Sequence, residues 1–327
     1  MRRIKRKPVH FVFKAHSGGE EYHSKPIKKE IKTLVVEEVS GELINKQIKK
    51  EDIRKPFSFK GNLNFVTKKR LFLRALKKGK KVVYGETLLN YREKKILEDL
   101  SRKTERLKSI SVEKPTVNNI KNYFIAFAKF NKFRHKLIQR TIKRVIRKKE
   151  TPLEAQYGTA HSLLSRELRK EGIESSREIT PLVFPWDIIV LRKLMSGIAP
   201  SRIKPIEYKK AYISDKGERW VVYGRKHNIL YHKKIIEIIT GKKYDQITDK
   251  DFRFYALVET TMLNRLSEKQ VDKIIREADI SLMFGFNSLP IPVRDNISHK
   301  EFHNKLISLL NKHSSFQKIY KQFKTIH

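Results

Sequence analysis

Residues 118–150 read NNIKNYFIAFAKFNKFRHKLIQRTIKRVIRKKE, and this stretch predicts one long helix. Residues three or four positions apart share one side of an α-helix. At that spacing one side is basic and carries Lys129, Lys132, Lys136, Arg140, Lys143 and Arg147. The opposite side is apolar and carries Ile120, Phe124, Phe127, Ile138, Ile142 and Val145, with Phe130, Phe133 and Leu137 between the two sides. The pattern predicts an amphipathic helix whose apolar side packs on the rest of the protein.

The basic side of this helix needs a partner, because like charges one turn apart repel each other. The plain alternative is an ordinary solvated helix face. The composition of the whole chain favours a polyanionic partner, since 74 Lys and Arg residues against 35 Asp and Glu residues give a formal net charge of +39 over 327 residues. Residues 1–150 hold 43 basic and 15 acidic residues, and residues 151–327 hold 31 and 20. We therefore expect the N-terminal half to bind the polyanion.

Nucleic acid is the polyanion that such a charge most commonly serves, and an anionic membrane surface is the alternative. Phe130 and Phe133 alternate with cations, so they can stack on bases, although packing in the core is the alternative role. The sequence contains no RNP1 pattern, KH clamp or zinc-finger spacing. We expect phosphate-backbone contacts with DNA or RNA, without base-specific recognition.

The predicted nucleic-acid contacts come from an N-terminal arm, a basic turn and the long helix. They are Arg2, Arg3, Lys5, Arg6, Lys7, Lys77, Lys78, Lys80, Lys81, Lys129, Lys132, Lys136, Arg140, Lys143, Arg144, Arg147, Lys148 and Lys149.

Several classes of site and location are excluded or disfavoured by composition. The chain has no cysteine, which excludes disulfides, thiolate zinc sites and cysteine nucleophiles. It has no apolar run of about 18 residues, so we expect no transmembrane helix. Its first residues, MRRIKRKPVHFVF, lack the apolar core of a secretory signal. We expect a protein of the cytoplasm, nucleoid or organelle matrix, or one packaged inside a virion, and we predict no cofactor.

The distribution of apolar runs predicts an α+β fold that is predominantly helical. Residues 1–8 read as a basic disordered arm, 9–85 as a small β-containing region, 86–150 as a basic helical segment and 151–327 as a mainly helical domain. The strand signals are HFVF, KTLVVEEV, ELINKQI and KVVYG, with a hairpin turn expected at Ser40-Gly41. Residues 65–78 are ambiguous between helix and strand, and Gly79 suits the position just past a helix end.

The C-terminal half carries clear helix-boundary signals. Residues 187–196 follow Pro185 and precede Gly197, which predicts a helix. Capping-box spacing is present at three pairs, namely Ser175 and Glu178, Ser267 and Gln270, and Ser298 and Glu301. An apolar stripe over residues 302–323 predicts either core packing or a seam for a partner helix, so other proteins of an assembly are possible partners there.

Motifs for catalysis are weak throughout the chain. There is neither a GxxxxGK[ST] loop nor a GxGxxG turn. His299 and His303 have metal-binding spacing but no third ligand, so we predict no metal site. Asp245, Asp249 and Asp251 lie close together in the sequence, but Thr248 and Asp251 are better explained as a helix start. The spacing of Glu93 and Lys95 occurs by chance in a chain rich in both residue types.

These observations favour a non-enzymatic structural component of a nucleoprotein assembly, either a ribonucleoprotein or a packaged viral or plasmid genome. One alternative is a DNA replication accessory or protein primer, similar in role to a terminal protein, that offers a loop serine hydroxyl. Ser288 and Ser298 are the candidate serines. A second alternative is a metal-dependent nuclease, and the sequence leaves open whether any catalytic activity exists.

Overall fold

The computed structural model describes residues 9–14, 27–37, 74–87, 90–179, 184–216 and 249–277, and the single residues 243, 246 and 308. The chain divides into two compact units. The first comprises Met1–Thr104 and Phe127–Pro181, and the second comprises Glu105–Ala126 and Leu182–His327.

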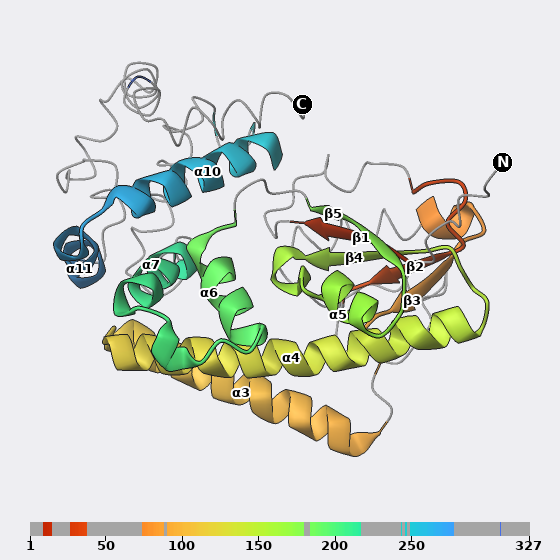
Figure 1. Cartoon of the computed structure of the whole chain (residues 1–327), viewed down its shortest axis with the longest axis horizontal. Helices are drawn as coiled ribbons and strands as arrows, with labels where there is room; N and C mark the ends of the chain where they lie inside the picture. Colours follow the sequence, from red (N-terminus) through yellow and green to blue (C-terminus); the bar gives the residue numbers. More distant parts are fainter. Residues whose placement is uncertain are drawn as a thin grey trace. The chain divides into compact units, whose positions relative to one another are not determined.

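The first unit is built on a parallel sheet of five strands (Figure 1). The strands are β1 (Val9–Lys14), β2 (Thr33–Val36), β3 (Lys81–Tyr84), β4 (Leu153–Gly158) and β5 (Ser175–Ile179). Their order across the sheet is β3-β2-β4-β1-β5. The register is set by the pairing of Val9 with both Leu153 and Ser175, and of Thr33 with both Lys81 and Leu153.

Both faces of this sheet are buried, because side chains alternate between the two faces and each face has an apolar cover. On one face, strand residues that include Phe11, Phe13 and Leu153 pack against helix α4 (Val117–Arg147) and helix α5 (Leu164–Lys170). On the other face, Leu34, Val36, Val82 and Tyr84 pack with Ile27, Ile31 and Ala75. Burial on both faces explains why the strands read as short continuous apolar runs.

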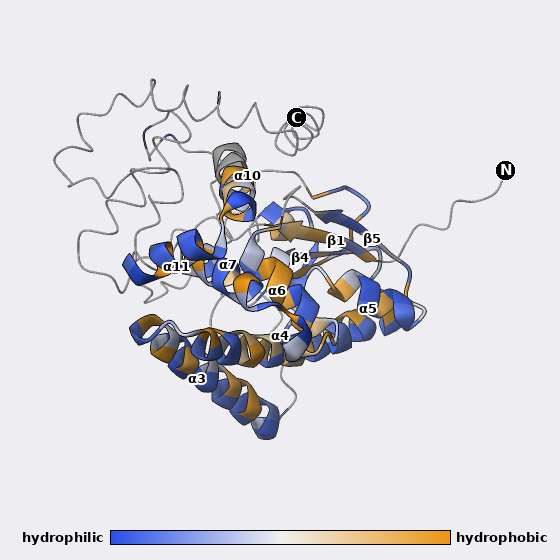
Figure 2. Cartoon of the chain, turned by 60° about the vertical axis from the view of Figure 1, so that its left-hand side comes forward, coloured by the Kyte–Doolittle hydropathy of each residue, from blue (hydrophilic) through white to orange (hydrophobic). Residues whose placement is uncertain are grey.

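Two long helices link β3 to β4. Helix α3 (Tyr91–Glu113) is followed by α4, which has 31 residues. The predicted long helix is therefore confirmed, and its apolar side is buried at Ile120, Phe124, Ile138, Ile142 and Val145. Figure 2 shows hydrophobic and hydrophilic residues alternating along both helices, as amphipathic helices require. The described helices include none long and apolar enough to cross a bilayer.

The second unit is helical in the ranges that the structure describes. Its helices are α6 (Trp186–Met195), α7 (Pro205–Lys216), α10 (Asp249–Arg265) and α11 (Glu268–Glu277), with a short 3-10 turn η4 at Pro200–Arg202. The capping box predicted at Ser267 and Gln270 is confirmed, since each residue accepts from the other's backbone nitrogen, at 3.4 and 2.9 Å. The helix predicted before Gly197 is α6, and Gly197 has the left-handed φ of +95° that favours glycine.

The fold class is the predicted one, with the sheet built differently from the expectation. The strand signals HFVF, KTLVVEEV and KVVYG fall on β1, β2 and β3, whereas ELINKQI and Ser40-Gly41 lie outside the described residues. The sheet also takes in β4 and β5, so the domain boundary expected at residue 151 falls inside the first unit. The capping box predicted at Ser175 and Glu178 is wrong, because pairing with β1 makes this segment strand β5.

Candidate nucleic-acid interface

The basic side of α4 divides into a solvent-exposed part and a paired part. Lys129, Lys132 and Lys136 are exposed, and no other residue in the described ranges forms an ion pair with them. We call these three residues the α4 lysine row. They lie three and four positions apart, so the row faces one direction and spans about 10 Å along the helix. Arg147, Lys148 and Lys149 at the end of the helix are exposed as well.

The other cations on this side of α4 bind groups of the protein itself. The guanidinium of Arg140 donates to both carboxylate oxygens of Glu93, at 2.5 and 3.0 Å, and to the carbonyl oxygen of Thr87 at 2.8 Å. Lys143 pairs with Glu171. Arg144 donates to the hydroxyl of Thr87 at 3.3 Å. Part of the predicted basic surface therefore holds neighbouring segments in place.

The basic turn at residues 77–81 also divides. Lys77 and Lys78 are exposed beside Gly79, whose φ is +66° at the end of a helical turn, as predicted. Lys80 is buried and donates to the carbonyl oxygens of Lys28, Lys29 and Ile31. Since an ammonium has three donors, this use corrects the prediction that Lys80 contacts nucleic acid. Lys81 forms an ion pair with Glu150 at 2.5 Å.

The remaining predicted positions lie outside the described residues. They are the arm cations Arg2, Arg3, Lys5, Arg6 and Lys7, the candidate serines Ser288 and Ser298, and the histidines His299 and His303.

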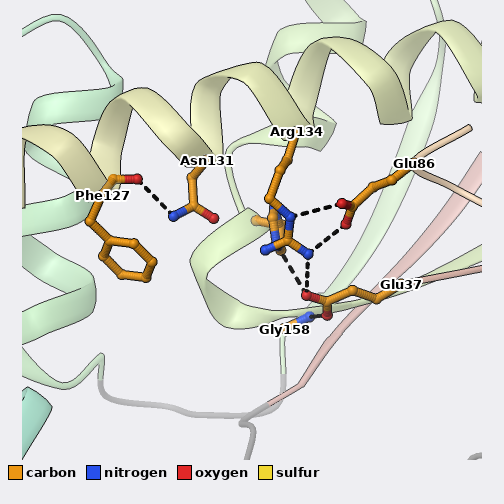
Figure 3. Close-up of polar contacts among 7 residues, drawn as sticks. Glu37, Glu86, Phe127, Asn131, Arg134 and Gly158 are labelled. Carbon is orange, nitrogen blue, oxygen red and sulfur yellow. Dashed lines mark hydrogen bonds and ion pairs between the residues drawn. The ribbon is translucent and has the colours of Figure 1, made fainter. Parts of the chain in front are cut away.

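A buried ion cluster fixes the rotation of α4 under the lysine row (Figure 3). The Nε and Nη2 atoms of Arg134 donate to the two carboxylate oxygens of Glu86, at 2.9 and 2.5 Å, and Nη2 also donates to Glu37 at 2.8 Å. The second oxygen of Glu37 accepts from the backbone nitrogen of Gly158 at 3.1 Å. We call Arg134, Glu37 and Glu86 the arginine clamp. Its hydrogen bonds join α4 to the ends of β2, β3 and β4, and they would break if the helix rotated about its axis.

Sequence reasoning missed the arginine clamp, although a signal was present. Arg134 lies between Lys132 and Lys136 in the chain, yet the helical period turns it away from the lysine row toward the apolar side. An arginine in that position indicates a buried ion pair, because long charged side chains are rarely buried alone. Glu37 and Glu86 follow apolar strands within one or two residues, where parallel strands end at a common edge of the sheet.

At this edge, β2 and β4 are neighbours whose connections run to opposite sides of the sheet. β2 leads to β3 on one side, and β4 leads toward β5 on the other. Open α/β sheets commonly bind ligands at such a position. Here the guanidinium of Arg134 and the carboxylates of Glu37 and Glu86 occupy it and satisfy one another, and Arg134 keeps its charge: burial alone would lower its pKa, but the two carboxylates raise it. The arrangement is suited to holding a helix in position.

No known protein family, curated protein or solved structure matches this chain. The residues themselves therefore carry the functional argument. Within the described ranges, no three His, Asp or Glu side chains come together in a way that would hold a metal ion.

A layer of aromatic and histidine side chains lies beside the clamp. The ring of His161 is 5.1 Å from that of His135 and 5.6 Å from that of Tyr157, between ring centres, and its Nε2 atom lies 3.4 Å from the nearer Glu37 oxygen. Burial, followed by the charge of Arg134, lowers the pKa of His161 to about 3. Burial and the charges of the two glutamates raise the pKa of Tyr157 well above its ordinary value. Both side chains are therefore neutral at neutral pH.

The buried, neutral His161 makes the stability of the fold depend on pH. A lowered pKa means that the unfolded chain takes up a proton below about pH 6.5, whereas the folded chain does so only near pH 3. The free energy of unfolding therefore decreases as the pH is lowered through this window, by about 1.4 kcal/mol per pH unit. When the pH is lowered from 6.5 to 4.5, we expect His161→Gln to lose about 2 kcal/mol less unfolding free energy than the wild type loses, as measured by urea unfolding. Parallel pH curves for the two proteins would contradict the prediction.

Proposed function

We propose that this protein binds nucleic acid through phosphate-backbone contacts, without reading sequence, as a structural component of a nucleoprotein assembly. The observation that carries the proposal is the α4 lysine row, three exposed ammonium groups on one side of a helix without an ion pair in the described ranges. The row belongs to a chain with a net charge of +39. Such a protein acts where nucleic acid is held, in the cytoplasm, the nucleoid, an organelle matrix or a virion.

The chemistry of the row supports phosphate as its target. Lysine carries a compact ammonium on a flexible stem, which follows a phosphate backbone without defining one base geometry. The arginine clamp supports the same reading, because it keeps the row pointing outward when its lysines repel one another. Other exposed cations of the same unit, at the end of α4 and at the basic turn, add to its positive charge; they include Arg147, Lys148, Lys149, Lys77 and Lys78.

Removing the lysine row tests the proposal. In Lys129→Gln/Lys132→Gln/Lys136→Gln, binding to a 20-base-pair duplex weakens and becomes less sensitive to salt, because three phosphate contacts are lost. The slope of log K against log salt becomes shallower by about 2.7, and affinity at 0.1 M salt falls by about two orders of magnitude or more. Stability is unchanged, since the three side chains are exposed. Fluorescence anisotropy over a salt series measures both effects, with urea unfolding as the check on the fold.

A charge-matched variant controls for net charge. Lys269→Gln/Lys273→Gln/Arg276→Gln removes the same charge from exposed positions of α11 in the second unit. It should retain most of the affinity and the salt slope. Equal losses in both variants would show a diffuse charge effect without an interface on α4. Binding to phosphatidylserine vesicles without binding to nucleic acid would overturn the proposal in favour of a membrane surface.

A further inference from the structure

Helix α3 begins with an aromatic side chain that lies almost fully in solvent. Tyr91 is 80% exposed, and the only other large hydrophobic side chain exposed in the described ranges is Ile198, at 39%. The start of the helix is fixed, because the side-chain oxygen of Asn90 accepts from the backbone nitrogen of Glu93 at 2.9 Å. The backbone of Tyr91 is therefore fixed at the helix start, and its ring has little packing around it.

Exposed cations follow Tyr91 along the same helix. Arg92, Lys95 and Lys103 are exposed, and none of them is ion-paired with another described residue. Their spacing of three and eight positions places them on one side of α3, over about 17 Å. Lys95 is one turn beyond Tyr91, so its ammonium and the tyrosine ring share a side of the helix. The neighbouring Lys94 and Arg102 are paired with Glu98 and Asp99, which separates them from this row.

We propose that this surface of α3, made of Tyr91, Arg92, Lys95 and Lys103, binds single-stranded nucleic acid with an unpaired base stacked on Tyr91. The inference rests on the proposed function and specifies a second surface with its own class of ligand. An exposed aromatic ring beside a row of cations is the combination that single-strand binders use, since the ring takes the base and the cations take the backbone. A base within a duplex has both faces stacked already and has no free face for Tyr91.

An anionic membrane surface has the same charge but fits the geometry less well. An interfacial helix inserts a continuous apolar side into the headgroup region. On α3 only Tyr91 is an exposed large hydrophobic residue, and the exposed positions that follow are charged or polar, including Glu98 and Asp99. One ring supplies too little apolar area for insertion, whereas it is sufficient for one base.

The test compares Tyr91→Ala with Tyr91→Phe in the full chain. Each variant is titrated with an oligo(dT) 20-mer and with a 20-base-pair duplex. We expect Tyr91→Ala to weaken binding of the single strand by about tenfold or more and to leave duplex binding unchanged. Tyr91→Phe retains the ring and should bind the single strand as the wild type does. Because the side chain is exposed, the thermal unfolding midpoints of all three proteins should agree.

The outcomes separate this inference from the function on which it rests. If the wild type binds neither oligonucleotide, the proposed function fails and the inference fails with it. If the wild type binds both and Tyr91→Ala still binds the single strand with undiminished affinity, only the inference is overturned. An equal loss on single strand and duplex, or a failure of Tyr91→Phe to restore binding, overturns it too, because stacking requires an unpaired base and a ring.

Discussion

An Arg134→Ala variant should lose about 3–5 kcal/mol of unfolding free energy, because it leaves two buried carboxylates without their cation. Glu86 is 1% exposed and Glu37 is 12% exposed, so both carboxylates are largely shielded from bulk solvent. Urea unfolding followed by circular dichroism measures the loss. A variant that unfolds at the wild-type urea concentration would show that the arginine clamp contributes nothing to the fold.

Two further variants isolate the charge imbalance from the loss of packing. Arg134→Met/Glu37→Gln/Glu86→Gln removes all three charges and should recover part of the lost stability, since neutral groups of similar size carry a much smaller desolvation cost. Arg134→Lys keeps the charge but not the two-pronged bond to Glu86, and it should fall between wild type and Arg134→Ala. The same stability in Arg134→Ala and the neutral triple variant would assign the effect to packing alone.

Gly85→Ala should destabilise the first unit by about 3 kcal/mol, at the upper end of what overpacking commonly costs. A Cβ atom at this position would lie 1.4 Å from the hydroxyl oxygen of Tyr157, 2.7 Å from the ring carbon that bears it, and 3.3 Å from the carbonyl oxygen of Val36. Tyr157 is 2% exposed and cannot swing into solvent without opening the core. Thermal and urea unfolding report the cost.

The double variant Gly85→Ala/Tyr157→Phe provides the check. Removing the hydroxyl removes the closest clash and leaves the ring carbon, so the double variant should be more stable than Gly85→Ala but less stable than Tyr157→Phe. Strictly additive effects of the two substitutions would mean that the two positions do not meet.

The sequence was sufficient to predict features that depend on local periodicity. The length of α4, its buried positions from Ile120 to Val145, and the strands β1, β2 and β3 follow from spacing and apolar runs alone. The capping box at Ser267 succeeded for the same reason, since both partners lie within one helical turn. The one at Ser175 failed because pairing with β1, far away in the chain, overrode the local signal.

The candidate site was predictable only in part, because residues far away in the sequence determine which cations are paired and which stay exposed. The periodicity of α4 placed Lys129, Lys136 and Arg140 on one side, but it could not show that Arg140 meets a glutamate 47 positions earlier. In the sequence, Lys80 is indistinguishable from the other lysines of the basic turn, and only the structure shows that its ammonium donates to three carbonyl oxygens. Tyr91 was not singled out, since an aromatic residue at a helix start reads equally well as buried.

The strand order has a consequence for how the chain is made. Among the described strands, β1 pairs with β4 and β5, and β2 is joined to β1 through β4, so β1 leaves the ribosome well before its partners, which lie beyond residue 150. Until then its apolar side chains and its backbone hydrogen-bonding groups have no native partner, which exposes the nascent chain to association with other chains. A highly basic nascent chain repels its own copies, and salt screens this repulsion. The synthesis of this protein would therefore be sensitive to ionic strength before folding is complete.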